Sequence, residues 1–141
     1  MPENWYQIGQ EIYGESEKDR SGKSLSFSDD GKILAIGAHY ANEGGHVRIY
    51  KNNSGTWEQI GSDIDGEQKN DESGYSVSLS SDGSIVAIGA VKNDGSGKNS
   101  GHVRIYKNNS GTWEQIGSDI DAESRGDNFG VSVSLSSDGS I

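Results

Sequence analysis

The sequence predicts an all-β fold, and three observations support the prediction. Only 30% of the 141 residues are hydrophobic and 21 are glycine, yet Val, Ile, Leu, Trp and Tyr gather in short runs separated by Gly, Asn, Asp and Ser, as in short strands joined by turns. No stretch has apolar residues at the i, i+3, i+4 spacing of an amphipathic helix. The string "GHVRIYKNNSGTWEQIGSDID" occurs at residues 45–65 and again at 101–121.

The repeat has a period that identifies a surface loop. Trp57 and Trp113 are 56 residues apart, whereas Trp5 and Trp57 are 52 apart. The four-residue difference lies in a polar segment that reads "HYANEGG" at 39–45 and "VKNDGSGKNSG" at 91–101. A length change confined to such a segment indicates a loop between elements that keep their lengths.

Four strand signals follow one another in the second copy. "YSVSLS" at 75–80 alternates serine with apolar residues, and "IVAIGA" at 85–90 is apolar throughout, as in a strand covered on both faces. After the loop come the alternating "HVRIYK" at 102–107 and the short "TWEQIG" at 112–117. Four antiparallel strands per repeat of this length are typical of a β-propeller blade. The main competitor is a β-sandwich, which would not require repeated text.

The strand count predicts about two and a half blades of four antiparallel strands per chain. The whole chain, 1–141, is then a single repeat array: residues 5–8 form the outer strand of a preceding blade, 23–61 blade 1, 75–117 blade 2, and 129–141 the start of blade 3. Closed propellers need four to eight blades, so both ends would expose an apolar face and an unpaired strand edge. We therefore expect association with other copies, as a homo-oligomer or filament.

The predicted structural core lies on the apolar sides of the central strands and on the outer-strand tryptophans. Its members are Ile36, Val47, Ile49, Trp57, Ile88, Val103, Ile105 and Trp113. Because Trp5, Trp57 and Trp113 occupy equivalent places in successive repeats, we expect them to be separate outer-strand anchors and not one ligand cage.

Several of these strings resemble known repeats. "FGVSVSLSSDGS" at 129–140, with "IVAIGA" and "GHVRIY", is similar to the FG-GAP repeat of integrin α-chain propellers and their bacterial relatives. "SLSFSDDGKILAIGA" at 24–38 also resembles a WD-repeat blade, although Tyr50 and Tyr106 stand where that family has tryptophan. The whole chain looks like the tandem repeats of large bacterial surface proteins. The resemblance implies an extracellular or cell-surface location, but no particular reaction.

Charge and composition exclude several classes of partner and site. The net charge of −10 would repel nucleic acids and anionic membranes, whereas cations, uncharged glycans or a protein ligand stay possible. The absence of cysteine excludes thiolate catalysis and cysteine metal sites. No apolar run is long enough to span a bilayer, and the opening residues do not have the pattern of a signal peptide.

Two acidic loops, 62–74 and 118–130, are the richest candidates for a metal site. Carboxylates are the ligands that calcium prefers, and the candidates are Asp63, Asp65, Asp71, Asp119 and Asp121. No stretch has the spacing of a known calcium loop, and the metal loop of integrin-type repeats would lie where this chain has only "SSDGS". We therefore favour solvated loops held by Ile64 and Ile120, and expect calcium to be dispensable.

No catalytic or cofactor site is predicted. His46 and His102 occupy equivalent places in two different blades, so they should not meet at one metal ion. The sequence has no recognisable Ser-His-Asp arrangement, phosphate loop, zinc spacing or dinucleotide fingerprint. The prediction is a non-enzymatic binding or structural module. The alternative is part of a propeller enzyme or a glycan-binding surface protein with its site on the acidic loop face, and an enzyme would need a distinctive polar cluster in one copy only.

Overall fold

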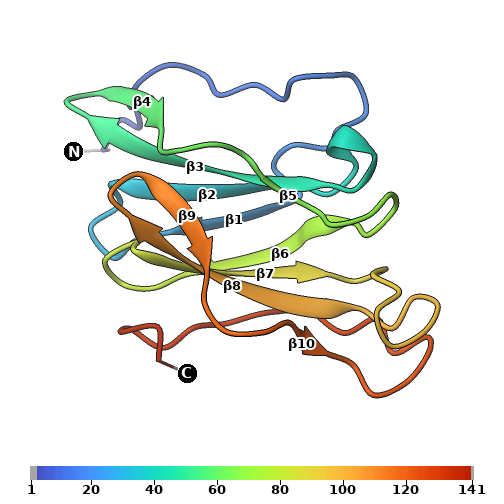
Figure 1. Cartoon of the computed structure of the whole chain (residues 1–141). Helices are drawn as coiled ribbons and strands as arrows, with labels where there is room; N and C mark the ends of the chain where they lie inside the picture. Colours follow the sequence, from blue (N-terminus) through green and yellow to red (C-terminus); the bar gives the residue numbers. More distant parts are fainter. Residues whose placement is uncertain (1–2, 141) are drawn as a thin grey trace.

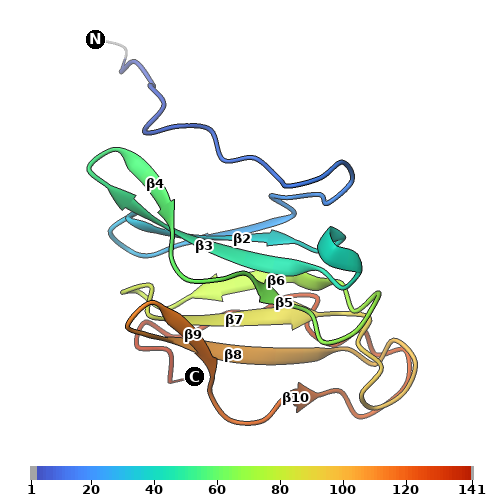
Figure 2. The same ribbon diagram turned by 45° about the horizontal axis from the view of Figure 1, so that its top comes forward.

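The computed structural model describes residues 3–140 as two antiparallel sheets stacked on each other (Figure 1). Each sheet has five strands, and the described residues contain no α-helix, only the 3-10 turn η1 (Ala41–Glu43). The fold is therefore all-β, as predicted. The N-terminal segment crosses the outer side of the first sheet, and the C-terminal segment lies beneath the second (Figures 1 and 2).

Sheet 1 consists of strands in the order β1-β2-β3-β4, with β5 also paired to β3. Its strands are β1 (Ser24–Phe27), β2 (Ile33–Ala38), β3 (His46–Asn53), β4 (Thr56–Gln59) and β5 (Ile64–Asp65). Strand β4 pairs with residues 50–53 of β3, and β5 pairs with residues 46–47. The two short strands therefore share one edge of β3, and each sheet has five strands where the sequence predicted blades of four.

Sheet 2 repeats this arrangement. Its strands are β6 (Ser73–Leu79), β7 (Ile85–Ala90), β8 (His102–Asn109), β9 (Thr112–Gln115) and β10 (Ile120–Asp121). The central register is conserved between the sheets, since Ala35 pairs with Ile49 in the first and Ala87 with Ile105 in the second. One register shift interrupts the pairing of β6 with β7, between Ser73 and Ser76.

The predicted "SDGS" turn joins β6 to β7, and hydrogen bonds to its aspartate hold it in place. The Asp82 carboxylate accepts hydrogen bonds from the Ser84 backbone N–H at 2.9 Å and from the Ser80 hydroxyl at 2.8 Å. Gly83, at φ 72°, supplies the left-handed conformation that follows the aspartate. Asp30 and Asp138 hold the equivalent turns in the same way.

The hydrophobic core lies between the two sheets. Sheet 1 contributes one face of β2 and β3 together with β5, and sheet 2 contributes one face of β6, β7 and β8. The buried residues are Ala35, Val47, Ile49, Ile64, Val77, Leu79, Val86, Ile88 and Tyr106, with Ile33, Ile60 and Trp113 packed against them.

The predicted core residues differ in burial according to the face they occupy. Ile36, Val47, Ile49, Ile88 and Val103 are buried, whereas Trp57, Ile105 and Trp113 are half-buried. Ile105 is the equivalent of Ile49, but it lies on the side of sheet 2 that faces no complete sheet. The two tryptophans lie on outer strands, and each indole donates a hydrogen bond to a backbone carbonyl of the preceding repeat.

The serines of the alternating strands join each repeat to the next. Ser24 Oγ donates to the Gly74 carbonyl at 2.8 Å, and Ser26 Oγ accepts from the Leu79 N–H at 2.9 Å. One repeat later, Ser76 Oγ donates to the Gly130 carbonyl at 2.7 Å, and Ser78 Oγ accepts from the Leu135 N–H at 3.0 Å. The same packing mode therefore occurs twice along the stack.

The strand predicted at 5–8 is not formed. The described residues before Ser24 contain no strand, and Trp5 is 96% exposed. A strand needs a ladder partner, and the described chain offers no third strand beside residues 5–8. The segment still occupies its repeat position, because Trp57 Nε1 donates to the Ile8 carbonyl as Trp113 Nε1 donates to the Ile60 carbonyl.

The first strand of blade 3, predicted within 129–141, is likewise absent from the described residues. Residues 129–140 contain only the isolated parallel bridge of Phe129 with Gly101. In the complete repeats the first strand is defined by its hairpin partner, and here no second strand lies beside it. Residue 141 lies outside the described residues. The boundaries predicted for blades 1 and 2 also change, because β5 and β10 fall inside the acidic loops.

Candidate functional site

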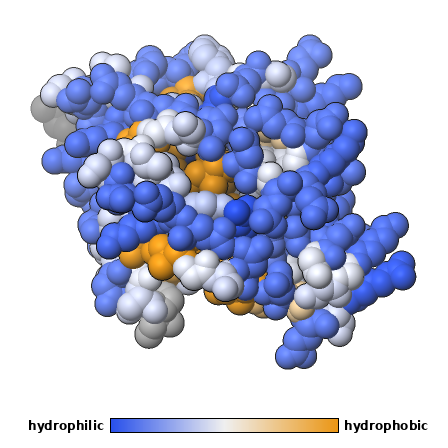
Figure 3. Space-filling view, in the orientation of Figure 1, coloured by the Kyte–Doolittle hydropathy of each residue, from blue (hydrophilic) through white to orange (hydrophobic). Residues whose placement is uncertain are grey.

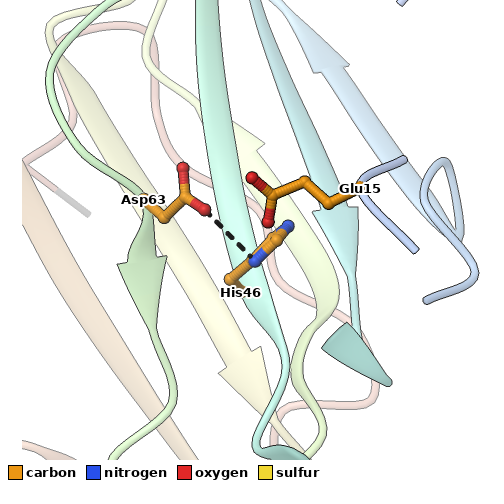
Figure 4. A group of neighbouring side chains, drawn as sticks. All are labelled: Glu15, His46 and Asp63. Carbon is orange, nitrogen blue, oxygen red and sulfur yellow. Dashed lines mark ion pairs between the residues drawn. The ribbon is translucent and has the colours of Figure 1, made fainter. Parts of the chain in front are cut away.

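Two equivalent polar clusters lie where β3 and β8 begin. The first contains Glu15, His46 and Asp63 (Figure 4), and the second contains Glu67, His102 and Asp119. In each, the histidine opens the third strand, the aspartate comes from the loop that follows the outer strand, and the glutamate comes from the loop before the first strand. Both imidazoles are buried, with 2% exposure.

In the first cluster, His46 Nδ1 lies 3.4 Å from Asp63 Oδ2 (Figure 4). Arg48, two residues further along β3 and so on the same face, donates from Nε to Asp63 Oδ1 at 3.1 Å. Its guanidinium also contacts Glu15, and Gln59 donates to Asp63 at 2.7 Å. Both carboxylates are therefore paired with one arginine.

The second cluster has the same plan with longer distances. His102 Nδ1 lies 3.4 Å from Asp119 Oδ2, and Arg104 lies 3.5 Å from Asp119 and 3.6 Å from Glu67. Gln115 links the group, since it accepts from Arg104 Nε at 3.0 Å and donates to Asp119 at 2.7 Å. Hydrogen bonds thus join Arg104, Gln115 and Asp119, whereas His102 Nδ1 has no hydrogen-bond partner among the described residues.

Electrostatics favour the charged forms of Asp63 and Arg48. Burial alone would raise the pKa of Asp63, but hydrogen bonds from Arg48 and Gln59 outweigh it and lower the pKa. Burial opposes the charge of Arg48 as well, but the hydrogen bond to Asp63 and the attraction of Asp63 and Glu15 together raise the pKa of the guanidinium. The pair is ionised over the whole physiological range.

The donor set of each cluster, one imidazole and two carboxylates, is of a kind that binds divalent transition metals. Each cluster, however, already contains a guanidinium within 4 Å of both carboxylates. The arginine supplies the positive charge that a bound cation would otherwise supply. The arrangement fits a bridge that ties the acidic loops to the third strand better than a metal centre.

The metal candidates named from the sequence do not converge on one site. Asp63 and Asp119 join the two histidine clusters, and Asp121 Oδ1 lies 3.9 Å from His102 Nδ1. Asp65 accepts a hydrogen bond from the Asn42 amide at 3.4 Å and is not part of either cluster. That calcium is dispensable stays a prediction.

Asp71, a further candidate, is a buried turn residue. Its carboxylate accepts from the Gln68 backbone N–H and from Asn93 Nδ2, both at 3.0 Å. Asp19 and Asp127 accept from the backbone in the same way, from Ser16 and Ser124. The recurrence of this aspartate in three repeats therefore reflects the shape of the loop.

Sequence reasoning missed Glu15, Arg48 and Arg104 as members of the clusters. The arginines could have been found from strand geometry, because His46 and Arg48 are two residues apart and project from the same face of β3. Glu15 could not, because it reaches the cluster from a segment without regular structure.

Comparison with protein families supports the repeat assignment. Residues 63–106 match the family model of the FG-GAP repeat, from β5 through most of β8. No curated protein matches the chain. In the part of the chain that the structure describes, no helix has the length and apolar character needed to cross a membrane. Together with the two stacked antiparallel sheets, the match confirms the predicted resemblance of residues 63–106 to the FG-GAP repeat.

Proposed function

We propose that this chain is a non-enzymatic, extracellular β-propeller repeat module that associates with further copies of itself through its two end faces. FG-GAP repeats are typically extracellular, which supports the proposed location. One observation carries the proposal of self-association: several apolar residues on the outer faces of the two sheets are exposed, whereas their equivalents between the sheets are buried.

The outer face of sheet 1 has the first set of such residues. Leu25 and Phe27 of β1 are 58% and 52% exposed. Their equivalents on β6, Val77 and Leu79, are 8% and 7% exposed, because they pack against sheet 1. The outer face of sheet 1 thus has the apolar pattern of a packing face without a sheet in front of it.

The outer face of sheet 2 also has apolar residues that are more exposed than their equivalents in the core. Ile64 of β5 is 6% exposed in the core, whereas its equivalent Ile120 of β10 is 47% exposed. Ile49 is 1% exposed, whereas Ile105 is half-buried. A hollow of about 280 Å³ remains between this face and residues 129–135. The face of the molecule seen in Figure 3 is mainly hydrophilic, with separate small hydrophobic areas.

The two end faces are the two sides of the internal interface, so a second copy can stack sheet 1 onto sheet 2 of the first. Residues 131–137 of the first copy and residues 23–29 of the second are sequence equivalents and would compete for one place. One of the two segments must therefore move aside or pair with the other chain. Because each copy carries a net charge of −10, we expect salt to strengthen the association.

Cross-linking between cysteine variants tests this geometry, and the chain has no cysteine of its own. Within one chain the Asp29 N–H donates to the Ser81 carbonyl at 2.8 Å, and Ser81 N–H donates to Ser137 one step further. In a stack, Ser81 of one copy therefore lies beside Asp29 of the next. We expect a short bismaleimide to join chains carrying Ser81→Cys to chains carrying Asp29→Cys.

Two controls make the cross-linking result interpretable. A single chain carrying both cysteines should cross-link internally, which verifies the reagent's reach. Chains carrying Ser81→Cys mixed with chains carrying Glu58→Cys, an exposed position on β4, should stay unlinked. Equal yields of two-chain product in the two mixtures would reject head-to-tail stacking.

The absence of catalysis is proposed on the likeness of the two histidine clusters. They recur at the same place in both sheets, and in each an arginine is paired with the carboxylates. Incubation with a panel of polysaccharides and measurement of released reducing ends tests this part of the proposal. Turnover that purified protein catalyses and that the Arg48→Met or Arg104→Met variants alter would overturn it.

A further inference from the structure

A hollow of about 430 Å³ lies at the end of the two sheets where β2 and β7 finish. Three basic side chains line it: Arg20 and Lys23 precede β1, and Lys92 follows β7. Such a concentration of positive charge is notable in a chain with 12 basic and 22 acidic residues. The hollow has the volume of a small-molecule site.

His39 forms part of the wall and is only 3% exposed. Its Nδ1 atom has no hydrogen-bond partner among residues 3–140. The imidazole lies 4.2 Å from the Tyr40 ring and meets the Tyr75 ring edge-on at 5.6 Å. Burial lowers the pKa of His39, so the ring is neutral at pH 7 and Nδ1 can donate or accept according to its tautomer.

Two of the basic groups are available to a ligand. The Arg20 guanidinium lies 4.6 Å from the centre of the Tyr40 ring, and the Lys23 ammonium lies 4.4 Å from the centre of the Tyr75 ring. Neither forms an ion pair with a carboxylate in the described part of the chain. These contacts position the cations and leave N–H groups free to donate.

Lys92 is paired with the one carboxylate that lines this hollow. Its Nζ lies 2.6 Å from Glu72, which is buried. The hydrogen bond that Lys92 donates to Glu72 raises the pKa of Lys92, so the lysine stays protonated. With this pair neutral overall, Arg20 and Lys23 leave the hollow with two uncompensated positive charges.

The cluster is present in one repeat only, although the scaffold around it is repeated. The equivalent of His39 is Val91, that of Lys23 is Tyr75, and that of Arg20 is Glu72. Val91 is 4% exposed, so an apolar side chain fills the same place in the next repeat. Packing therefore does not require the imidazole, and burying one with an unsatisfied nitrogen costs stability.

We infer that this hollow is a binding site for a small ligand bearing an oxyanion, of the size of one acidic sugar residue. Arg20 and Lys23 bind the oxyanion by charge-assisted hydrogen bonds, and the neutral His39 ring forms the wall beside them. The shared chemistry is a carboxylate or phosphate group. All its lining residues come from a single chain, although Lys23 and Val131 belong to the two segments that would compete for one place in a stack.

Titration of the full chain by NMR tests the inference, with glucuronate, inorganic phosphate and glucose as probes. We expect saturable binding of glucuronate or phosphate, weaker or absent binding of glucose, and shifts of the His39 ring signals. Tighter binding of glucuronate than of phosphate would indicate that the sugar ring contributes, and equal binding would indicate recognition of the oxyanion alone. Both results support the site.

A double variant and a matched control complete the test. Arg20→Ala with Lys23→Ala should weaken binding about tenfold or more, because charge-assisted hydrogen bonds are lost. Lys51→Ala with Lys107→Ala removes the same charge from exposed positions on β3 and β8 and should leave binding within about twofold. Both double variants should melt cooperatively, since all four side chains are exposed. Absence of saturable binding, or equal losses in the two double variants, would overturn the site.

Discussion

Gly37 and Gly89 set the distance between neighbouring repeats. A Cβ atom on Gly37 would overlap the Gly74 carbonyl oxygen, and one on Gly89 would overlap the Gly130 carbonyl oxygen. Neither glycine has a positive φ, so the requirement is for space and not for backbone freedom. The glycine of the repeated "AIGA" string is therefore explained by the close approach of the next repeat.

Replacing Gly37 by alanine should lower the free energy of unfolding by about 1 to 3 kcal/mol, because the two sheets must separate to accept a methyl group. Denaturant unfolding measures the loss. Gly31→Ala is the matched control: its Cβ would meet open space, and φ of 70° imposes a strain of about 1 kcal/mol. Equal costs at the two positions would contradict the packing explanation.

His39 should make the stability of the protein depend on pH. Its pKa in the folded state lies below the ordinary value of 6.5 because the ring is buried, with charged Glu72, Lys23, Arg20 and Lys92 nearby. Below pH 6.5 the unfolded state binds more protons at this histidine than the folded state does. The free energy of unfolding is therefore highest above pH 6.5, as far as this group is concerned, and decreases as the pH falls from 6.5 through the lower pKa of the folded state. Between about pH 7.5 and pH 5, the melting temperature should therefore fall less in His39→Gln than in wild type.

The other two histidines serve as the internal comparison for this experiment. His46→Gln and His102→Gln alter equivalent sites in the two clusters, so they report the effect of removing any buried imidazole. If all three variants reduced the fall in melting temperature at pH 5 equally, the pH dependence could not be assigned to His39 in its hollow.

At the scale of elements, the alternating serines join neighbouring repeats through backbone groups. Ser26→Ala would leave the buried Leu79 N–H without its acceptor and should cost about 1 to 3 kcal/mol. Ser78→Ala removes the equivalent bond to Leu135, which is only half-buried, and should cost less. Chemical denaturation compares the two, and a larger effect of Ser78→Ala would contradict this account.

The central strand β7 should dominate the stability of the core. Ile88 is 2% exposed between the sheets, so Ile88→Ala should cost about 2 to 5 kcal/mol by removing packed atoms and leaving a cavity. Leu25→Ala, on the open face of β1, should cost well under half as much at low protein concentration. Stability of Ile88→Ala within about 0.5 kcal/mol of wild type would contradict the strand assignment.

How much of this could be predicted from the sequence depended on whether an element has its partner in the chain. Strands β2, β3, β7 and β8 were predictable because apolar runs and alternation reflect burial that the chain itself provides. The strand expected at 5–8 and the one expected after Phe129 have the same patterns but no ladder partner among the described residues. Strands β5 and β10 escaped prediction because two residues are too few to form a pattern.

The candidate sites were less predictable, because they combine residues from separate segments. Asp63 and Asp119 were named from the acidic loops, but the sequence did not indicate that Arg48 and Arg104 would neutralise them. The His39 hollow was missed because its basic residues are far apart in the sequence: Arg20 and Lys23 precede β1, and Lys92 follows β7. A comparison of the repeats position by position would have found it, since His39 replaces the valine of the next copy.

At the scale of the whole molecule, two repeated antiparallel sheets stack through one interface, and the two sides of that interface are left open at the ends. The exposed residues Leu25, Phe27 and Ile120 and the half-buried Ile105 belong to those open sides. Partners that cover them would remove apolar surface from water, and this drives association.

Size-exclusion chromatography with light scattering, over a range of protein and salt concentrations, tests this claim most directly. The account predicts particles whose mass is a multiple of the 15.0 kDa chain and rises with protein and with salt concentration. Leu25→Asp with Ile105→Asp should shift the population toward the single chain while leaving a cooperative melt. A folded particle of 15.0 kDa at every concentration of wild-type protein would contradict it.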